Sequence, residues 1–216
     1  MAEYVQGDNH FVNAEKIMRE VLREEYWETP SRLDYQILRV NSVGNERKIL
    51  CSLQLGEEIF EINQQKAEGT LDAFSRGLKA VLFEKYFSLK SLSMVSFELK
   101  SSGTQTSSRP SSNEQEMDEC RFDMKAELSL TLKNVKGGEF TFKTTGFDFV
   151  QSSLLLTLEA FLFFVNSERA FRKARTRYSL GTSDADYIRD VVLPVLAKNN
   201  DYRKIAEQID LENKPK

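Results

Sequence analysis

The chain has 216 residues, of which 40% are hydrophobic, 29% charged and 11% aromatic, and its formal net charge is −3. The only histidine, His10, excludes a metal site built from several histidines of one chain. The length allows one domain or two small ones, but no (β/α)₈ barrel of roughly 250 residues beside anything else. Because the net charge gives no overall positive field, we expect no nucleic-acid partner. We also expect no metal or other cofactor.

The cysteines and the apolar runs bear on the compartment. Cys51 and Cys120 stand far apart and form no C-x-x-C pair, which favours two reduced, packed thiols. Residues 1–12 are polar and lack the basic and apolar regions of a signal peptide. The longest apolar run, 154–165, is shorter than the ~20 residues needed to cross a bilayer. We therefore expect a cytoplasmic protein that does not enter a membrane.

The N-terminal region, 1–32, is predicted to be a polar tail followed by an amphipathic helix. Asn13 can cap this helix, and apolar residues at helical spacing give it one buried stripe. Pro30 ends the helical region because the residue before a proline avoids that conformation. The lone tryptophan, Trp27, is interpreted as an anchor to the main body, with docking of another protein as the alternative.

Residues 33–86 form a first predicted unit of three strands and a helix. Apolar and polar residues alternate with period two, most clearly over 48–55, which indicates half-buried strands. Glycines mark the turns between the strands, one of them at 41–46. After Gly69, apolar residues recur at helical spacing to about Lys85, which predicts the helix.

Residues 87–166 repeat the same order. The alternation is strongest over 122–133, where one face is apolar and the other polar, as in an antiparallel sheet with one wet face. In chain order we predict a strand at 89–100, a mobile loop at 101–118, the strand at 122–133, a hairpin at Gly137-Gly138, a return strand with Phe140 and Phe142, and a long helix opened by Gly146.

The middle of that last helix, 154–165, is apolar nearly all round. A helix of this kind must be covered on more than one side, and a sheet covers only one. We expect the second cover to come from another subunit, which predicts a homodimer. The terminal helices are the alternative cover.

The fold class that follows is α+β. Two pseudo-symmetric strand-strand-strand-helix units, 33–86 and 87–166, together make a domain at 33–166, with helices on one side of antiparallel sheets. Residues 167–216 are a C-terminal helical extension. It contains a helix from Ser183 or Asp184 that Pro194 should kink or end, and a last short helix at 201–209.

Two short motifs resemble signatures of a known family. Glu68-Gly69-Thr70-Leu71-Asp72-Ala73 is similar to a glycine-rich turn followed by Pro-Val-Asp-Ala, although the proline and a second glycine are missing. Asp148-Phe149-Val150-Gln151-Ser152-Ser153 is similar to a run such as Asp-Ile-Val-Glu-Ala-Ser that opens the final helix. Over 33–166 the chain thus resembles the C-terminal regulatory domain of the α-isopropylmalate synthase and citramalate synthase family.

The resemblance implies a non-catalytic regulatory module of leucine biosynthesis. That domain has two strand-rich units each closed by a helix, forms dimers, and binds leucine or isoleucine near the dimer interface. The family's catalytic acyltransferase barrel is absent here, so the chain is not expected to be an enzyme by itself, and a separate synthase subunit is a possible partner. Leu154, Leu155 and Leu156 replace the usual small residues, so the alternative is a structural or interaction dimer that has lost its effector site.

The candidate effector site combines the two predicted helix starts. A helix N-terminus offers free N–H groups that suit an amino acid's carboxylate, and nearby acids suit its ammonium. Turns and helix caps explain the same residues equally well. The candidate residues are Gly69, Thr70, Leu71, Asp72, Ala73, Phe74, Thr144, Thr145, Gly146, Phe147 and Asp148.

No catalytic constellation is present. The sequence contains no G-x-S-x-G, P-loop or G-x-G-x-x-G motif. Basic residues crowd the end of the long predicted helix, where cations complement the negative end of the helix dipole. The alternative is a docking patch for an acidic partner or a phosphate. These residues are Arg169, Arg172, Lys173, Arg175 and Arg177.

Overall fold

The computed structural model describes residues 9–28, 33–39, 47–101, 126–199 and 205–206. The predicted turn at 41–46, the predicted loop over most of 101–118, most of the predicted helix at 201–209, and Cys120 lie outside the described residues.

The first unit has the predicted order. The strands form an antiparallel sheet in the order β1-β2-β3, with Cys51 opposite Tyr35 and Ile62. The alternation in β2 places Ile49, Cys51 and Leu53 in the core, as the period of two predicts. The elements are β1 (Leu33–Arg39), β2 (Arg47–Leu55), β3 (Glu58–Ala67) and α2 (Thr70–Leu82).

The second unit repeats that order. Its antiparallel sheet runs β4-β5-β6, and Leu130 stands opposite Phe97 and Phe142. Leu128, Leu130 and Leu132 are buried, whereas the alternate residues of β5 are less so, which confirms the predicted two-faced strand over 126–133. Its predicted first residues, 122–125, lie outside the described residues. The elements are β4 (Ser93–Ser101), β5 (Ala126–Lys133), β6 (Glu139–Gly146) and α3 (Phe149–Ser179).

The predicted start of the fourth strand is wrong. Phe87–Ser91 forms a short 3₁₀ helix, η2, and β4 begins at Ser93. The backbone N–H of Ser88 donates to the buried Glu168 carboxylate at 2.7 Å, and its hydroxyl donates to the Phe164 carbonyl. These bonds to α3 hold the segment in a turn before the strand starts.

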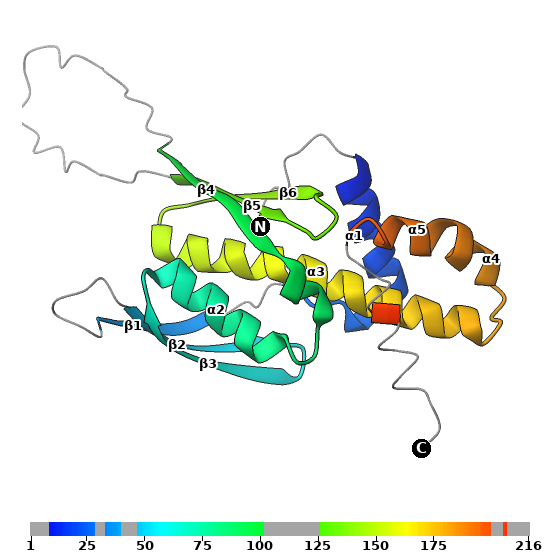
Figure 1. Cartoon of the computed structure of the whole chain (residues 1–216), viewed down its shortest axis with the longest axis horizontal. Helices are drawn as coiled ribbons and strands as arrows, with labels where there is room; N and C mark the ends of the chain where they lie inside the picture. The colour runs from blue at the N-terminus through cyan, green and yellow to red at the C-terminus, as the bar shows by residue number, and fades with distance from the viewer. Residues whose placement is uncertain (1–8, 29–32, 40–46, 102–125, 200–204, 207–216) are drawn as a thin grey trace, which may run out of the picture.

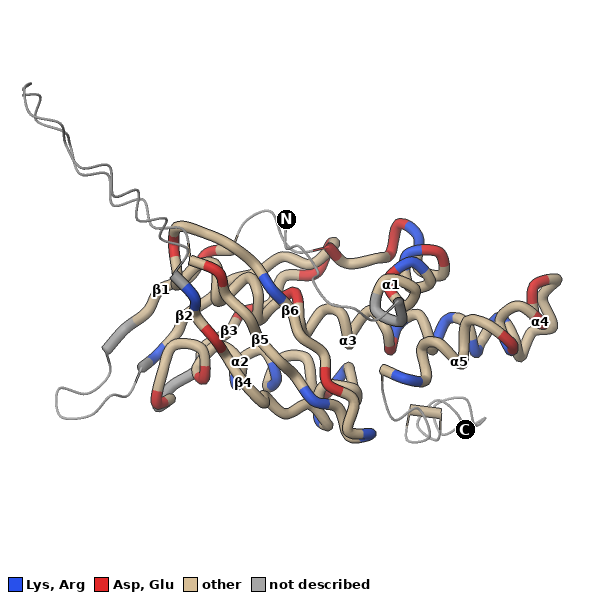
Figure 2. Tube along the Cα trace, turned by 90° about the horizontal axis from the view of Figure 1, so that it is seen from above, with Lys and Arg blue, Asp and Glu red and all other residues tan. Residues whose placement is uncertain are grey.

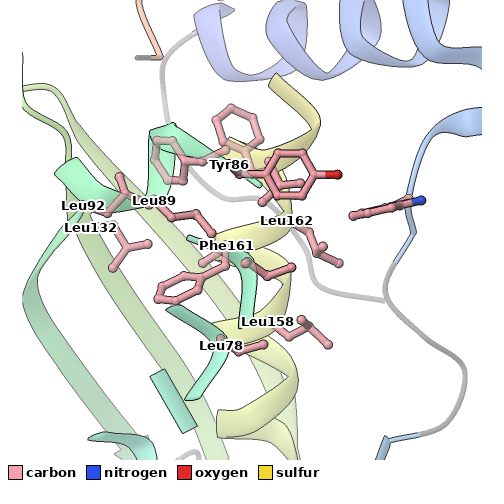
Figure 3. Close-up of a cluster of buried hydrophobic side chains, with 14 of the residues drawn as sticks. Leu78, Tyr86, Leu89, Leu92, Leu132, Leu158, Phe161 and Leu162 are labelled. Atoms are coloured by element: carbon pink, nitrogen blue, oxygen red, sulfur yellow. The ribbon is translucent and has the colours of Figure 1, made fainter. Parts of the chain in front are cut away.

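The layers confirm the α+β class. Figure 1 shows α2 and α3 lying between the two sheets. Each helix packs on one face of its own sheet, α2 on β2 and β3 and α3 on β5 and β6. The two units share one core, because Leu78 of α2, Phe161 of α3 and Leu132 of β5 converge in it (Figure 3).

The long helix α3 is covered within a single chain. Its apolar middle contacts β5, β6 and α2, and α1 (Asn9–Leu22) and α5 (Leu193–Leu196) add further cover. Leu154, Leu156 and Phe164 are completely buried. The second cover of this helix comes from α2, with the terminal helices farther along α3, so its burial does not require a second subunit. The homodimer stays a prediction. The helix also continues unbroken past residue 166 into the predicted extension.

The N-terminal helix begins earlier than predicted. It starts at Asn9, so Asn13 lies inside the helix with an exposed side chain and is not its cap. Ala14, Met18 and their helical neighbours form the buried stripe that packs on α3. Trp27 is buried edge-on against Phe60 and Tyr86, in agreement with its interpretation as an anchor.

The C-terminal helix does not break at Pro194. A continuous helical stretch runs through α4 (Ala185–Tyr187), the π-helical turn η3 (Ile188–Val192) and α5. In the π turn the Leu193 N–H bonds to the Ile188 carbonyl, five residues back. This wider turn accommodates the missing proline N–H without ending the helix.

Candidate functional site

The start of α2 holds the first half of the predicted site. Gly69 is the N-cap and accepts the Ala73 N–H at 2.9 Å, with no side-chain cap. Asp72 pairs with Arg76 at 2.8 Å and accepts the Glu68 N–H at 3.4 Å. The Asp72 carboxylate is thus engaged within the chain.

The hydrophobic candidates beside it differ in access. Ala73 and Phe74 are completely buried in the core, so neither can touch a ligand in this conformation. Leu71 is half-buried and packs against the core, and Thr70 is also half-buried. Of the six candidate residues around α2, Gly69, Thr70, Leu71 and Asp72 are therefore the accessible ones.

The start of α3 holds the second half. Asp148 is the N-cap, and its carboxylate accepts the Gln151 N–H at 2.9 Å, which is the capping role left open by the sequence. Gly146 ends β6 against Ser152, and a Cβ there would overlap the Ser152 hydroxyl. Phe147 is 70% exposed. Thr144 is half-buried and Thr145 exposed near the end of β6.

The two helix starts lie at the same end of the molecule. Figure 1 shows α2 and α3 beginning at the end opposite to α4 and α5. Strand β1 also lies at this end (Figure 1). There, partial burial and the nearby charge of Asp148 raise the pKa of Tyr35 above its ordinary value. The fold thus gathers the two predicted halves at one end, although no described contact joins Asp72 to Asp148.

The opposite end of α3 carries the predicted basic cluster. Ion pairs link Arg172 to Glu168, Lys173 to Glu25 and Arg177 to Asp184. Figure 2 shows acidic and basic positions intermixed where the chain leaves α1. Most of this cluster is therefore neutralised within the chain, in addition to any interaction with the helix dipole.

A cleft opens beside this cluster. At a rise of 1.5 Å per residue, Arg169 lies about 30 Å along α3 from Phe149 at the helix start. Its volume is about 540 Å³, and it adjoins a second cleft of about 780 Å³ that Arg169 and Glu25 also line. We call the smaller one the Arg169 cleft. It is lined by Glu25, Lys85, Tyr86, Arg169, Arg172, Lys173 and Thr176.

Buried polar contacts fix the walls of the Arg169 cleft. Asn166 donates to the Trp27 carbonyl at 2.8 Å and accepts the Trp27 N–H at 3.3 Å. Glu168 is fully buried and accepts from Ser88 and Arg172. Asn166 and Glu168 were not among the residues predicted from the sequence. The sequence marks them only as polar residues within an apolar helix. A buried polar side chain of this kind indicates a specific hydrogen-bond partner.

Metal and membrane features add little. Within the described ranges, no three His, Cys, Asp or Glu side chains are grouped so as to hold a metal ion. Among the described helices, α3 is long and apolar enough to cross a membrane by length and composition. However, 67% of its most apolar window is buried inside the fold, as in a core helix.

No protein-family model matches the chain, and no curated protein matches it. The class defined by the structure is an α+β fold of two repeated three-strand-and-helix units.

Proposed function

We propose that this chain is a non-catalytic regulatory module of the isopropylmalate synthase type, which binds a branched-chain amino acid and forms a homodimer. The observation that carries the proposal is the repeated order β-β-β-α, with both helices starting at one end of the molecule. Each start combines a glycine with an aspartate two or three residues later, as the family resemblance implies.

The proposed ligand is leucine or isoleucine. Free backbone N–H groups in the first turns of α2 and α3 favour a carboxylate, and the helix dipoles add partial positive charge there. Leu71 and the exposed ring of Phe147 offer apolar contact to an aliphatic side chain. Asp72 or Asp148 would have to share its present hydrogen bonds with the ligand's ammonium group.

The proposed dimer contact is an apolar strip on β4 and the start of α3. Leu99 stands opposite the buried Leu128 in the sheet register and so faces the helix layer, yet it is 54% exposed. Helix α3 packs on β5 and β6, which leaves this face of the edge strand partly open. Phe97 packs edge-on against Phe149 beside it. A second copy that covers this strip would bury apolar surface that is otherwise in water.

Calorimetry with leucine, isoleucine and valine tests the ligand. We expect saturable heat with at least one of them at millimolar concentration, and we expect Phe147→Ala to weaken it. Leu180→Ala is the matched control, since Leu180 is equally exposed but lies beyond the far end of α3. A folded protein that gives no heat with any of the three contradicts the effector role.

The second candidate is a structural or interaction dimer without an effector site. It is favoured by the internal hydrogen bonds of Asp72 and Asp148 and by the complete burial of Leu154 and Leu156, which replace small residues of the family signature. Light scattering at micromolar concentration tests the shared part of both candidates, because a monomer contradicts each. A dimer that no small molecule stabilises in a thermal-shift screen favours the second candidate, and co-purification of a synthase subunit favours the first.

A further inference from the structure

The Arg169 cleft contains more cationic groups than paired carboxylates. Lys85 pairs with Glu58 at 2.7 Å, Lys173 with Glu25 at 2.5 Å and Arg172 with Glu168 at 2.8 Å. Among the described residues no carboxylate pairs with Arg169. The fourth cation of the cleft therefore has no counter-charge at contact distance within the part of the chain that the structure describes.

The position of Arg169 is fixed by neutral groups. Its guanidinium lies 4.0 Å from the centre of the Trp27 ring, and Nη1 donates to Asn166 Oδ1 at 3.0 Å. A guanidinium has five N–H donors, and this is the one hydrogen bond that the described residues supply. Burial lowers the pKa of Arg169 below its ordinary value, and the charges of Tyr86, Glu25 and Glu58 offset this only in part.

Glu25 is the carboxylate best placed to compete for the same space. It lines both adjoining clefts and reaches from the 3₁₀ segment Arg23–Glu25 to Lys173 on α3. Its side chain is 59% exposed, so water screens this ion pair and an external anion can replace it at low cost. Arg23 adopts a left-handed φ of 53°, which is uncommon for a residue other than glycine.

We propose that the Arg169 cleft binds a small, multiply charged oxyanion, in competition with the Glu25 carboxylate. Arg169 supplies a fork of N–H donors, of which the described residues occupy one, and this fork suits two oxygens of one anion. Lys85 and Lys173 supply further positive charge. Phosphate and dicarboxylate groups share this chemistry. The site lies at the opposite end of α3 from the proposed amino-acid site and does not depend on it.

The lone tryptophan gives a local readout of this site. Trp27 is the only tryptophan of the chain and stacks under the Arg169 guanidinium, so an anion at Arg169 should change its fluorescence. The full-length protein is titrated with inorganic phosphate and, separately, with succinate, with sodium chloride holding the ionic strength constant. We expect a saturable change with at least one anion at millimolar concentration. The anion that binds more tightly shows whether the cleft takes a phosphate or a dicarboxylate group.

Three variants decide the assignment. Arg169→Gln should weaken binding about tenfold or more, because it removes the charge-assisted hydrogen bonds. Glu25→Gln should strengthen binding severalfold, because it removes the competing carboxylate while leaving a side chain of the same size. Arg189→Gln, which changes an exposed arginine outside the Arg169 cleft, should bind like the unchanged protein.

Other outcomes overturn the proposal. They are a folded protein that shows no saturable change with either anion, an equal loss in Arg169→Gln and Arg189→Gln, and weaker binding in Glu25→Gln. The Glu25→Gln variant changes an exposed side chain, so its result is informative even where Arg169→Gln fails to fold. A failed leucine titration leaves all three outcomes unaffected.

Discussion

The two β-β-β-α units share their strand order but differ in how each helix starts and what it packs against. Helix α2 has 13 residues, and its N-cap, Gly69, has open space around it and provides no side-chain cap. Helix α3 has 31 residues, and the side chain of its N-cap, Asp148, caps it two residues after Gly146, which packs against Ser152. The second unit is thus more tightly determined at its helix start.

The cores of the two units differ as well. Phe140 and Phe142 of β6 meet Phe163 and Phe164 of α3 in a cluster of edge-on and tilted rings. In the first unit the corresponding strand, β3, places Ile62 in the core and Phe60 beside it, and Phe60 packs edge-on against Trp27. The repeat therefore preserves the order of elements, while the second unit, which holds the long helix, carries more of the aromatic packing.

The largest effect is expected from Phe164→Ala. Phe164 is completely buried and contacts three other rings, so its truncation should lower the free energy of unfolding by about 3–5 kcal/mol. Chemical denaturation measures this loss. Phe147→Ala, at a ring that is mostly in water, is the matched control and should be nearly neutral. A small loss for Phe164→Ala would show that the aromatic cluster is not a principal part of the core.

The two glycines that precede the helices should respond differently to alanine. A Cβ at Gly146 would overlap Ser152 Oγ and stand 3.1 Å from Ser152 Cβ, so Gly146→Ala should cost about 1–3 kcal/mol of stability. Nothing lies within 4 Å of a Cβ at Gly69, and Gly69→Ala should change stability by less than ~0.5 kcal/mol. Thermal unfolding compares them, and Ser152→Ala should restore part of the Gly146→Ala loss. Equal losses at both glycines would remove the proposed asymmetry.

The two aspartates should differ by a smaller margin. Asp148→Ala removes an N-cap and should cost about 1 kcal/mol. Asp72→Ala removes a surface ion pair one turn along its helix and should cost only about 0.3–0.5 kcal/mol. Both are measured by urea unfolding, with Asp148→Asn expected to keep most of the cap. If Asp72→Ala were the more damaging change, α2 would depend on its first turn more than its geometry indicates.

The smallest effect on stability at neutral pH is expected from the Cys51 thiol. Burial raises the pKa of its thiol to about 12, so at pH 8 it should react with a disulfide reagent far more slowly than after unfolding. The unfolded thiol ionises near pH 9 while the folded one stays neutral. This group's contribution to stability is therefore complete below pH 9 and is lost as the pH rises towards 12. The rate is followed in a Cys120→Ser background, and rapid labelling of the folded chain would contradict the burial of Cys51.

The strands and the turn glycines were predictable because they depend on local patterns. The alternation in β2 and β5 placed Cys51, Leu53, Leu128 and Leu130 on the buried faces without knowledge of their partners. The boundaries were less predictable. The turn before β4 depends on Ser88 bonding to Glu168, 80 residues away in the sequence. The helix through Pro194 depends on a π turn that no local signal marks.

The candidate effector site was predicted as a set of residues, and the tertiary structure decided which of them remain accessible. The sequence placed Phe74 and Phe147 together as ligand contacts, but one is in the core and the other in water. Of the Arg169 cleft, the sequence predicted only the basic residues near the end of the long helix. Arg172 and Arg177 pair with acids close to them in the sequence, but the partner of Lys173 is Glu25, 148 residues away.

By itself the sequence determined the α+β class and the repeated order of elements, because apolar periodicity and turn residues act over a few neighbouring positions. Only the tertiary structure decided which elements cover α3, which of the candidate residues are buried, and that Arg169 lacks a counter-charge among the described residues. Burial and charge pairing are set by contacts between distant segments, such as Trp27 with Asn166, and those contacts form only when the whole chain is folded.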